Sequence, residues 1–331
     1  FTQSFNVLQN DWAKNPKANP DFLEGRLHMA TIHTIDLMHL GLADCTAAFL
    51  IETTEGPLLI ESGPASSLPH LRQGISNAGF NPEDIRHILL THIHLDHAGA
   101  AGWFAQNGAH IYVHPVGAPH LVDPSRLNAS ARRIYGDSLD SLLGEMEACP
   151  EELVHAVNDA DDITIGESTF TAIETPGHAI HHHAWDVRMK NERICFTGDV
   201  AGMRIPKSEA ITIPFAPPEV DLETWHTSLD RIASCSPDAL VLTHSGRTDT
   251  PVEHLQRMHQ LLEEESNAIM QILEDPLLTE TERISKYRAH AISHAIQAGA
   301  SPELAEAHIS EGHAMMNLMG VARYMKRRSR G

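Results

Sequence analysis

Residues 91–99 read Thr-His-Ile-His-Leu-Asp-His-Ala-Gly. The apolar residues 88–90 before them predict a buried strand, and the Ala- and Gly-rich residues that lead to Trp103 and Phe104 can start a helix. Three histidines and one aspartate are therefore expected in a tight turn at the end of a strand. Imidazole and carboxylate groups are ligands that suit zinc, iron and manganese. Because the chain has 24 histidines, this turn is a metal site only if further ligands come from elsewhere.

The composition indicates a globular chain of 331 residues, with 42% apolar residues and a formal charge of −20. There is no apolar run of about 18 residues and no basic-then-apolar signal segment, so we expect a cytoplasmic protein without a membrane span. The acidic charge argues against a nucleic-acid partner. The basic run at 326–330 is interpreted as a solvated helix end. The four cysteines have no paired spacing, which is typical of reduced thiols.

The pattern of apolar residues predicts a mixed β/α body followed by a helical region. We predict strands at 31–40, 46–52, 58–61, 85–90, 109–114, 163–165, 169–174, 184–189, 193–196 and 239–242, with helices at 67–78 and 222–233. Residues 116–158 are predicted to form a helical, irregular insertion. Helices are predicted at 254–273, 279–298 and 302–326.

Three segments follow from this pattern. Residues 1–28 are expected to be an N-terminal extension. If Met29 is the native start, this extension is an artificial addition or a pre-sequence. Residues 29–250 are expected to form the catalytic domain and residues 251–331 a helical C-terminal domain. The apolar stretch 315–319 is a candidate homodimer interface, with packing on the chain's own core as the alternative.

Four separate strand-end turns offer metal ligands. They are the turn with His92, His94, Asp96 and His97, and the turns with His178, Asp199 and His244. Gly, Pro or Thr flanks each turn, so each backbone can bend outward at the same edge. Two divalent ions need about six or seven donors, and one carboxylate can bridge them. The sequence therefore predicts a two-metal site.

These motifs resemble the metallo-β-lactamase-fold hydrolase superfamily. The similarity covers about residues 30–250 and is carried by the stretch 91–99, Thr-Pro-Gly-His at 175–178, Phe-Thr-Gly-Asp at 196–199 and Leu-Thr-His at 242–244. The resemblance implies an α/β fold, an αβ/βα sandwich of two mixed sheets with outer helices. It also implies the division of the ligands between the metals. His92, His94 and His178 would hold one ion, Asp96, His97 and His244 the other, and Asp199 would bridge them.

The resemblance implies a dinuclear metal-dependent hydrolase with a metal-bridging hydroxide that attacks an ester-like bond of a small molecule. Thioesters and carboxylic esters or lactones are favoured, and zinc is expected before iron or manganese. A phosphodiesterase, a mononuclear-iron sulfur dioxygenase and a catalytically silent metal-binding module are the alternatives. Asp96 is the candidate catalytic residue, which would orient the water and carry its proton.

Details of the motifs separate the branches of the superfamily. Asp96 is commonly missing from true β-lactamases. N-acyl-homoserine lactonases typically have a Tyr three residues after the bridging Asp, where this chain has Gly202. The helical region after His244 resembles glyoxalase II. The family's Asp-Thr-Gly strand end is Glu61-Ser-Gly here, and Glu61 is expected to orient a metal ligand.

Several polar residues remain without an assigned role. If residues 181–183 continue a strand, His181 and His183 face one side and His182 the other. Their simplest interpretation is as polar residues near the mouth of the site, with a metal role as the alternative. Arg247 near His244, and Arg132, Arg133 and Tyr135 in the insertion, could reach a substrate or lie on the surface.

Overall fold

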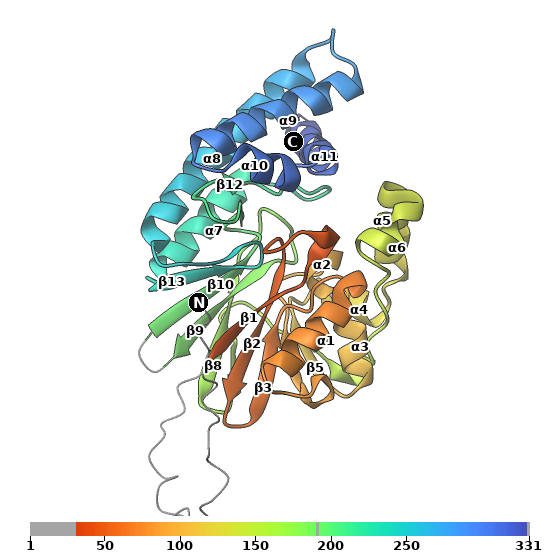
Figure 1. The fold of residues 1–331 in the computed structure, drawn as a ribbon, viewed down its shortest axis with the longest axis vertical. Coiled ribbons are helices and arrows are strands. Elements are labelled where there is room, and N and C mark those ends of the chain that lie inside the picture. Colours follow the sequence, from red (N-terminus) through yellow and green to blue (C-terminus); the bar gives the residue numbers. More distant parts are fainter. Residues whose placement is uncertain (1–30, 190–191, 330–331) are drawn as a thin grey trace, which may run out of the picture.

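The computed structural model describes residues 31–189 and 192–329, which form two six-stranded sheets packed face to face between layers of helices (Figure 1). The first sheet has the order β1 (Ile32–Asp36), β2 (Ala47–Thr53), β3 (Gly56–Ile60), β4 (His87–Leu89), β5 (His110–Val113) and β6 (Val154–Ala156). The second has the order β14 (Gly246–Thr248), β13 (Ala239–Leu242), β10 (Glu192–Gly198), β9 (His183–Met189), β8 (Ser168–Glu174) and β7 (Asp162–Ile165). Both sheets are mixed, so the predicted αβ/βα sandwich is confirmed. The predicted extension at 1–28 lies outside the described residues.

The period-two alternation of the strands builds the core between the sheets. In β2, Phe49 and Ile51 point toward the second sheet, whereas Leu50 points toward the helices on the outer face. Phe49 meets Phe196 of β10 with ring centroids 5.4 Å apart. The central apolar layer therefore joins the two sheets and holds the ends of their strands in a fixed relation.

Helices cover the outer face of each sheet. Helices α1 (Leu68–Asn77) and α3 (Ala101–Gln106) pack Leu71, Ile75 and Phe104 on the first sheet. Helix α7 (Leu222–Ser234) packs Trp225 and Leu229 on the second. The predicted helices and strands are thus present, with shifted ends. One larger difference is that β1 ends at Asp36, because the Asp36 carboxylate accepts from the backbone N–H groups of Met38 and Asp44 and turns the chain.

The insertion at 116–158 is helical over α4 (Ala118–Val122), α5 (Ser125–Tyr135) and α6 (Leu139–Leu142). The prediction that it stays helical or irregular to residue 158 is wrong at its end, where β6 pairs in parallel with β5. β6 has only three residues, two half-buried and one exposed, so its sequence shows no alternation of apolar and polar residues. The short strands β11 (Met203–Arg204), β12 (Ile211–Thr212) and β14 were missed for the same reason.

The C-terminal region consists of α8 (Pro251–Glu274), α9 (Glu280–Gln297), α10 (Pro302–His308) and α11 (Glu311–Arg328). The predicted run at 302–326 is interrupted because Ser310 caps α11, its side chain accepting from the His313 N–H. Buried residues of α8, α9 and α11 belong to the same apolar cluster as the outer face of the second sheet. The core is therefore continuous across residue 251, and the domain boundary there stays a prediction.

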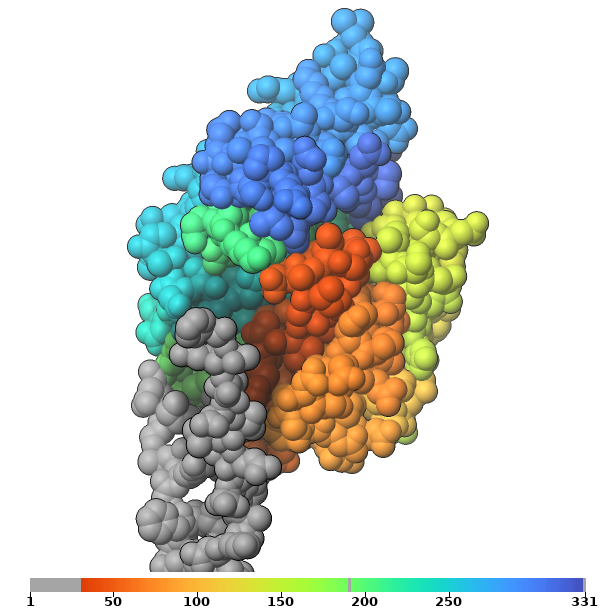
Figure 2. Space-filling model, viewed as in Figure 1, coloured from red at the N-terminus to blue at the C-terminus, as the bar shows by residue number. Residues whose placement is uncertain are grey.

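The stretch 315–319 lies in α11. Asn317 and Leu318 are buried in the chain's own core. The homodimer interface stays a prediction, and it now concerns the half-buried Met315, Met316 and Met319. In Figure 1 the helical region and helices α5 and α6 of the insertion lie at the end of the sandwich where α2 (Leu95–Ala98) is labelled, and Figure 2 shows them as the blue and yellow-green surfaces at that end. Among the described residues, no helix is both long and apolar enough to span a membrane.

Candidate metal centre

The structure brings together all seven side chains that the sequence predicts as metal ligands: His92, His94, Asp96, His97, His178, Asp199 and His244. Four come from the loop and the short helix α2 that follow β4, and the other three from the connections after β8, β10 and β13. Both sheets thus contribute strand ends to one site. His94 and Asp96 are partly exposed and the other five are buried, so the centre opens to solvent on the side of these two residues.

Gly198 lets β10 deliver Asp199 into this site. Its φ is +51°, and a Cβ there would lie 2.5 Å from Thr91 Oγ1 and 2.6 Å from His182 Nε2. No other residue type fits this turn. The Gly before the predicted bridging aspartate is therefore a requirement of the close approach between the two sheets.

Three imidazole nitrogens form a first donor group. His94 Nδ1 lies 3.0 Å from His92 Nε2 and 2.9 Å from His178 Nε2. A second group consists of Asp96, His97 and His244, whose donor atoms lie within 4.8 Å of one another. Asp96 Oδ2 is 3.8 Å from His97 Nε2 and 3.6 Å from His244 Nε2.

Asp199 lies between the two groups. Its Oδ2 is 3.4 Å from His178 Nε2, whereas its Oδ1 is 3.1 Å from His97 Nε2 and 3.3 Å from His244 Nε2. Each carboxylate oxygen thus faces a different donor group. The seven side chains thus lie together in two groups, and the division of ligands between two ions stays a prediction.

Hydrogen bonds on the far side of the rings fix how the imidazoles face the centre. His178 Nδ1 lies 2.8 Å from the Pro214 carbonyl oxygen and His244 Nδ1 2.9 Å from that of Cys45. A carbonyl oxygen only accepts, so both Nδ1 atoms donate. In the neutral ring the Nε2 lone pair then points into the centre, as a metal ligand requires.

Glu61 holds two more of the seven side chains, His97 directly and His92 through Thr91, from a fully buried position. Its Oε1 accepts from His97 Nδ1 at 3.0 Å, from Thr91 Oγ1 at 2.5 Å and from Thr243 Oγ1 at 3.1 Å. Thr91 Oγ1 in turn lies 3.0 Å from His92 Nδ1. Glu61 therefore orients one histidine of each donor group, and it occupies the place where the family usually has Asp.

The donor atoms of the site suit a bound cation. Burial lowers the pKa of His94 to about 3, so this donor is neutral at ordinary pH. Burial alone would raise the pKa of Asp199, but His97 and His244 hold it well below its usual value. Three donor atoms of the centre, His97 Nε2, Asp199 Oδ1 and His244 Nε2, are buried without a hydrogen-bond partner. Unpartnered buried donor atoms that point to one place are what a bound cation would satisfy, so the residues fit a metal.

The three histidines at 181–183 have separate roles, and the interpretation as one alternating strand is wrong. β9 begins only at His183, whose Nε2 is 2.7 Å from the Leu90 carbonyl oxygen. His182 Nδ1 is 2.8 Å from Thr175 Oγ1, and its Nε2 accepts from the backbone N–H of Asp199 at 3.2 Å. These two histidines therefore position the ligand loops, although their sequence gives no signal for it.

His181 is the third of these histidines. It lies near the mouth of the centre, with ring centroids 5.4 Å from His94 and Nε2 3.7 Å from the Glu219 carboxylate.

The arginines named from the sequence are engaged elsewhere. Arg247 pairs with Glu192 and Asp249, and Arg132 with Asp140 and Glu145. Arg133 is exposed. Tyr135 differs, because burial raises its pKa to about 12 and the Asp96 carboxylate adds to that rise. The phenol of Tyr135 is thus within electrostatic reach of the centre.

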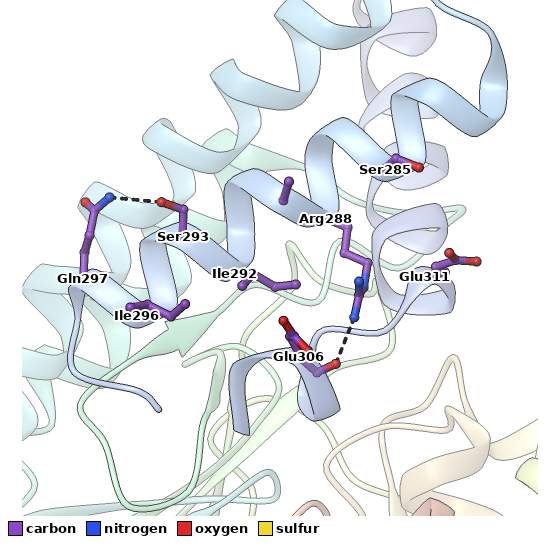
Figure 3. Close-up of a pocket in the computed structure, with 9 residues that line it drawn as sticks. Ser285, Arg288, Ile292, Ser293, Ile296, Gln297, Glu306 and Glu311 are labelled. Atoms are coloured by element: carbon purple, nitrogen blue, oxygen red, sulfur yellow. Dashed lines mark hydrogen bonds between the residues drawn. The ribbon is translucent and has the colours of Figure 1, made fainter. Parts of the chain in front are cut away.

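A hollow of about 440 Å³ lies between α9, α10 and α11 (Figure 3). A second hollow is lined by Arg204, Arg247 and their neighbours. None of the seven ligands lines either one. These hollows therefore belong to the helical region and its border, not to the metal centre.

Comparison with known proteins identifies the family. The family model described as the metallo-beta-lactamase superfamily matches residues 45–244, and the chain belongs to this superfamily. It is 30% identical over 194 residues to the metallo-beta-lactamase fold-containing protein ST1585 of Sulfurisphaera tokodaii, covering 56% of this chain and 72% of that protein. It is 28% identical over 127 residues to the N-acyl homoserine lactonase AttM of Agrobacterium fabrum, covering 36% of this chain but only 42% of that lactonase.

Solved structures share the fold over a longer part of the chain. The crystal structure of the archaeal superfamily protein ST1585 has a TM-score of 0.62 and 21% identity, and covers 88% of this chain and 98% of that one. The family protein TTHA1429 of Thermus thermophilus has a TM-score of 0.64 and 15% identity, and covers 90% and 94%. The likeness therefore extends beyond residues 45–244, and at these identities it concerns the fold alone.

Proposed function

We propose that this chain is a hydrolase that holds two divalent metal ions, zinc before iron or manganese, and cleaves an ester-like bond of a small molecule. The observation that carries the proposal is the position of Asp199, with one carboxylate oxygen toward each donor group. A single ion would need only one of the two groups. Two complete groups with a carboxylate between them support a dinuclear centre.

In this proposal His92, His94 and His178 would hold one ion, Asp96, His97 and His244 would hold the other, and Asp199 would offer a carboxylate oxygen to each. Such ions, when bound, lower the pKa of a water molecule and polarise a carbonyl oxygen. We expect Asp96 to orient that water and take its proton, because its side chain keeps 29% of its surface exposed while His97 and His244 beside it are buried. The neighbouring histidines are held by Glu61 and by backbone carbonyls, so the donor atoms are preorganised.

A carboxylic ester or lactone fits this centre better than an anionic substrate. A phosphodiester or a glutathione thioester needs cationic side chains, and Arg132 and Arg247 are already paired with carboxylates. The similarity to a lactonase over 127 residues supports the same choice. The phosphodiester, the thioester and the iron-dependent dioxygenase remain the outcomes that the experiment must separate.

The test is a substrate panel on zinc-, iron- and manganese-loaded protein with measured metal content. The panel contains an N-acyl lactone, an aryl ester, an acyl thioester and an aryl phosphodiester. We expect the zinc form to release acid from the lactone or ester fastest, and Asp199→Ala to lose turnover together with the ions of this centre. His70→Ala, which removes an exposed histidine on α1, is the matched control.

Three results would contradict the proposal. Preference for the phosphodiester would change the substrate class, and oxygen uptake by a form with a single iron would replace hydrolysis by oxygenase chemistry. Unchanged turnover in Asp199→Ala would remove this centre from the reaction altogether.

A further inference from the structure

A separate cluster of metal-competent side chains lies in the helical region. Glu265 of α8 and His290 and His294 of α9 place one donor atom each within 4.8 Å of one another. Among the metal-competent groups found in the described residues, this group alone contains none of the seven ligands above. It is also not part of the hollow in Figure 3, which another face of α9 lines with Arg288, Ile292 and Ile296.

Helix geometry brings the three donors together. His290 and His294 are four residues apart, so they lie one turn apart on one face of α9, with ring centroids 4.1 Å apart. Glu265 faces them from α8. Its Oε1 is 2.9 Å from His294 Nδ1 and 3.4 Å from His290 Nε2. The three side chains therefore span the contact between two adjacent helices.

This cluster is incompletely satisfied. Glu265 is only 4% exposed, yet its Oε2 has no hydrogen-bond partner, and neither has His290 Nε2. A buried carboxylate is costly unless it is paired or coordinates a metal. Both unpartnered atoms can act as metal ligands, so a cation between them would supply what each one lacks.

We propose that Glu265, His290 and His294 form a further metal site that binds a divalent ion of the zinc class and links α8 to α9. Two imidazoles and one carboxylate are a common zinc donor set, and water can complete the coordination. His290 and His294 are 30% and 31% exposed, which gives the ion a route from solvent. The site is independent of the proposed hydrolysis, and its role is to stabilise the helical region.

The first test is the zinc content of the full chain after loading and removal of excess metal. We expect wild type to hold one ion more per chain than His290→Ala, His294→Ala or Glu265→Gln, and all of them to keep the turnover of wild type. His226→Ala removes a half-exposed histidine of α7 that lies against His259 of α8 and should keep the wild-type count. Equal zinc content in wild type and in every variant of the cluster would overturn the proposal.

A second test needs no variant, so it stands even if a substitution prevents folding. Diethylpyrocarbonate modification of each histidine is measured by peptide mass spectrometry in metal-free and zinc-loaded protein. We expect zinc to protect His290 and His294, while His226 and His259 react equally in both forms. If zinc leaves the modification of His290 and His294 unchanged, the cluster is a hydrogen-bonded ion pair and not a metal site.

Discussion

His97 donates a hydrogen bond through Nδ1 to Glu61 Oε1 at 3.0 Å, and both side chains are fully buried. The bond fixes the ring so that Nε2 faces Asp199. It also explains how a chain with Glu in place of the usual Asp keeps the same centre. The same Glu61 oxygen serves Thr91 and Thr243, so one carboxylate links the loops of both sheets.

Glu61→Gln should therefore weaken metal binding without removing a ligand. The amide oxygen can still accept a bond, but its charge is lost and the basicity of His97 falls. Changes of this kind typically cost about 10- to 100-fold in metal affinity, which competition with a chromophoric chelator measures. Glu52→Gln is the matched control, because Glu52 pairs with His33 at 2.6 Å in the same sheet. Equal affinities in the two variants would show that Glu61 has only a packing role.

Asp96→Asn should separate catalysis from folding. The Asp96 side chain is 29% exposed, and Asp96 is the candidate proton acceptor. Loss of a general base typically lowers the rate about 10²- to 10⁴-fold. The first donor group should keep its ion, so metal analysis and kcat are measured on the same sample. If kcat is retained, the proton is carried by another group.

The sequence predicted the sandwich, and it predicted the seven side chains that the structure brings together at the strand ends, because both leave local signals. Alternation in residues such as Phe49, Leu50 and Ile51 marks a strand with two different faces, and Gly, Pro or Thr flanks each of the four turns. What the sequence did not predict depends on segments that meet only in space. His182 contacts the backbone of Asp199 across seventeen residues, and β6 exists only because β5 offers it a free edge. Neither leaves a periodic pattern.

Tyr135→Phe tests whether the insertion contributes to the reaction. The lactonase tyrosine is replaced by Gly202, where a Cβ would lie 2.7 Å from Ile211 and from Met258, so no larger residue fits. Tyr135 stays protonated, since burial raises its pKa to about 12, so its hydroxyl is a hydrogen-bond donor. Loss of such a donor lowers kcat on the order of 10²-fold. Tyr112→Phe, whose hydroxyl contacts His87 in the sheet, should leave kcat unchanged. Equal rates in both variants would place Tyr135 outside the reaction.

His183 makes the stability of the fold depend on pH. Burial lowers its pKa from 6.5 to about 3, so between these values the unfolded chain binds more protons than the folded chain. The contribution of His183 to the free energy of unfolding is complete above pH 6.5 and is lost as the pH falls toward 3. The free energy of unfolding changes by up to about 1.4 kcal/mol per pH unit in this range. Urea unfolding at several pH values should show a shallower slope for His183→Gln than for wild type. His70→Gln should keep the wild-type slope, and identical slopes in all three proteins would contradict this role.

Asn317→Ala should detach the last helix from the loop that precedes α7. Asn317 is buried, its Oδ1 accepts from the Phe215 N–H at 3.0 Å, and its Nδ2 donates to the Ile213 carbonyl at 2.8 Å. Truncation leaves both backbone groups without partners, at a cost of roughly 2–3 kcal/mol in the free energy of unfolding. Asn107→Ala removes an exposed side chain that bonds to the Trp103 carbonyl and should change the free energy far less. The metal content of the centre should survive Asn317→Ala, because none of its ligands lies on α11. If the two variants unfold at the same urea concentration, the helical region is held by its apolar contacts alone.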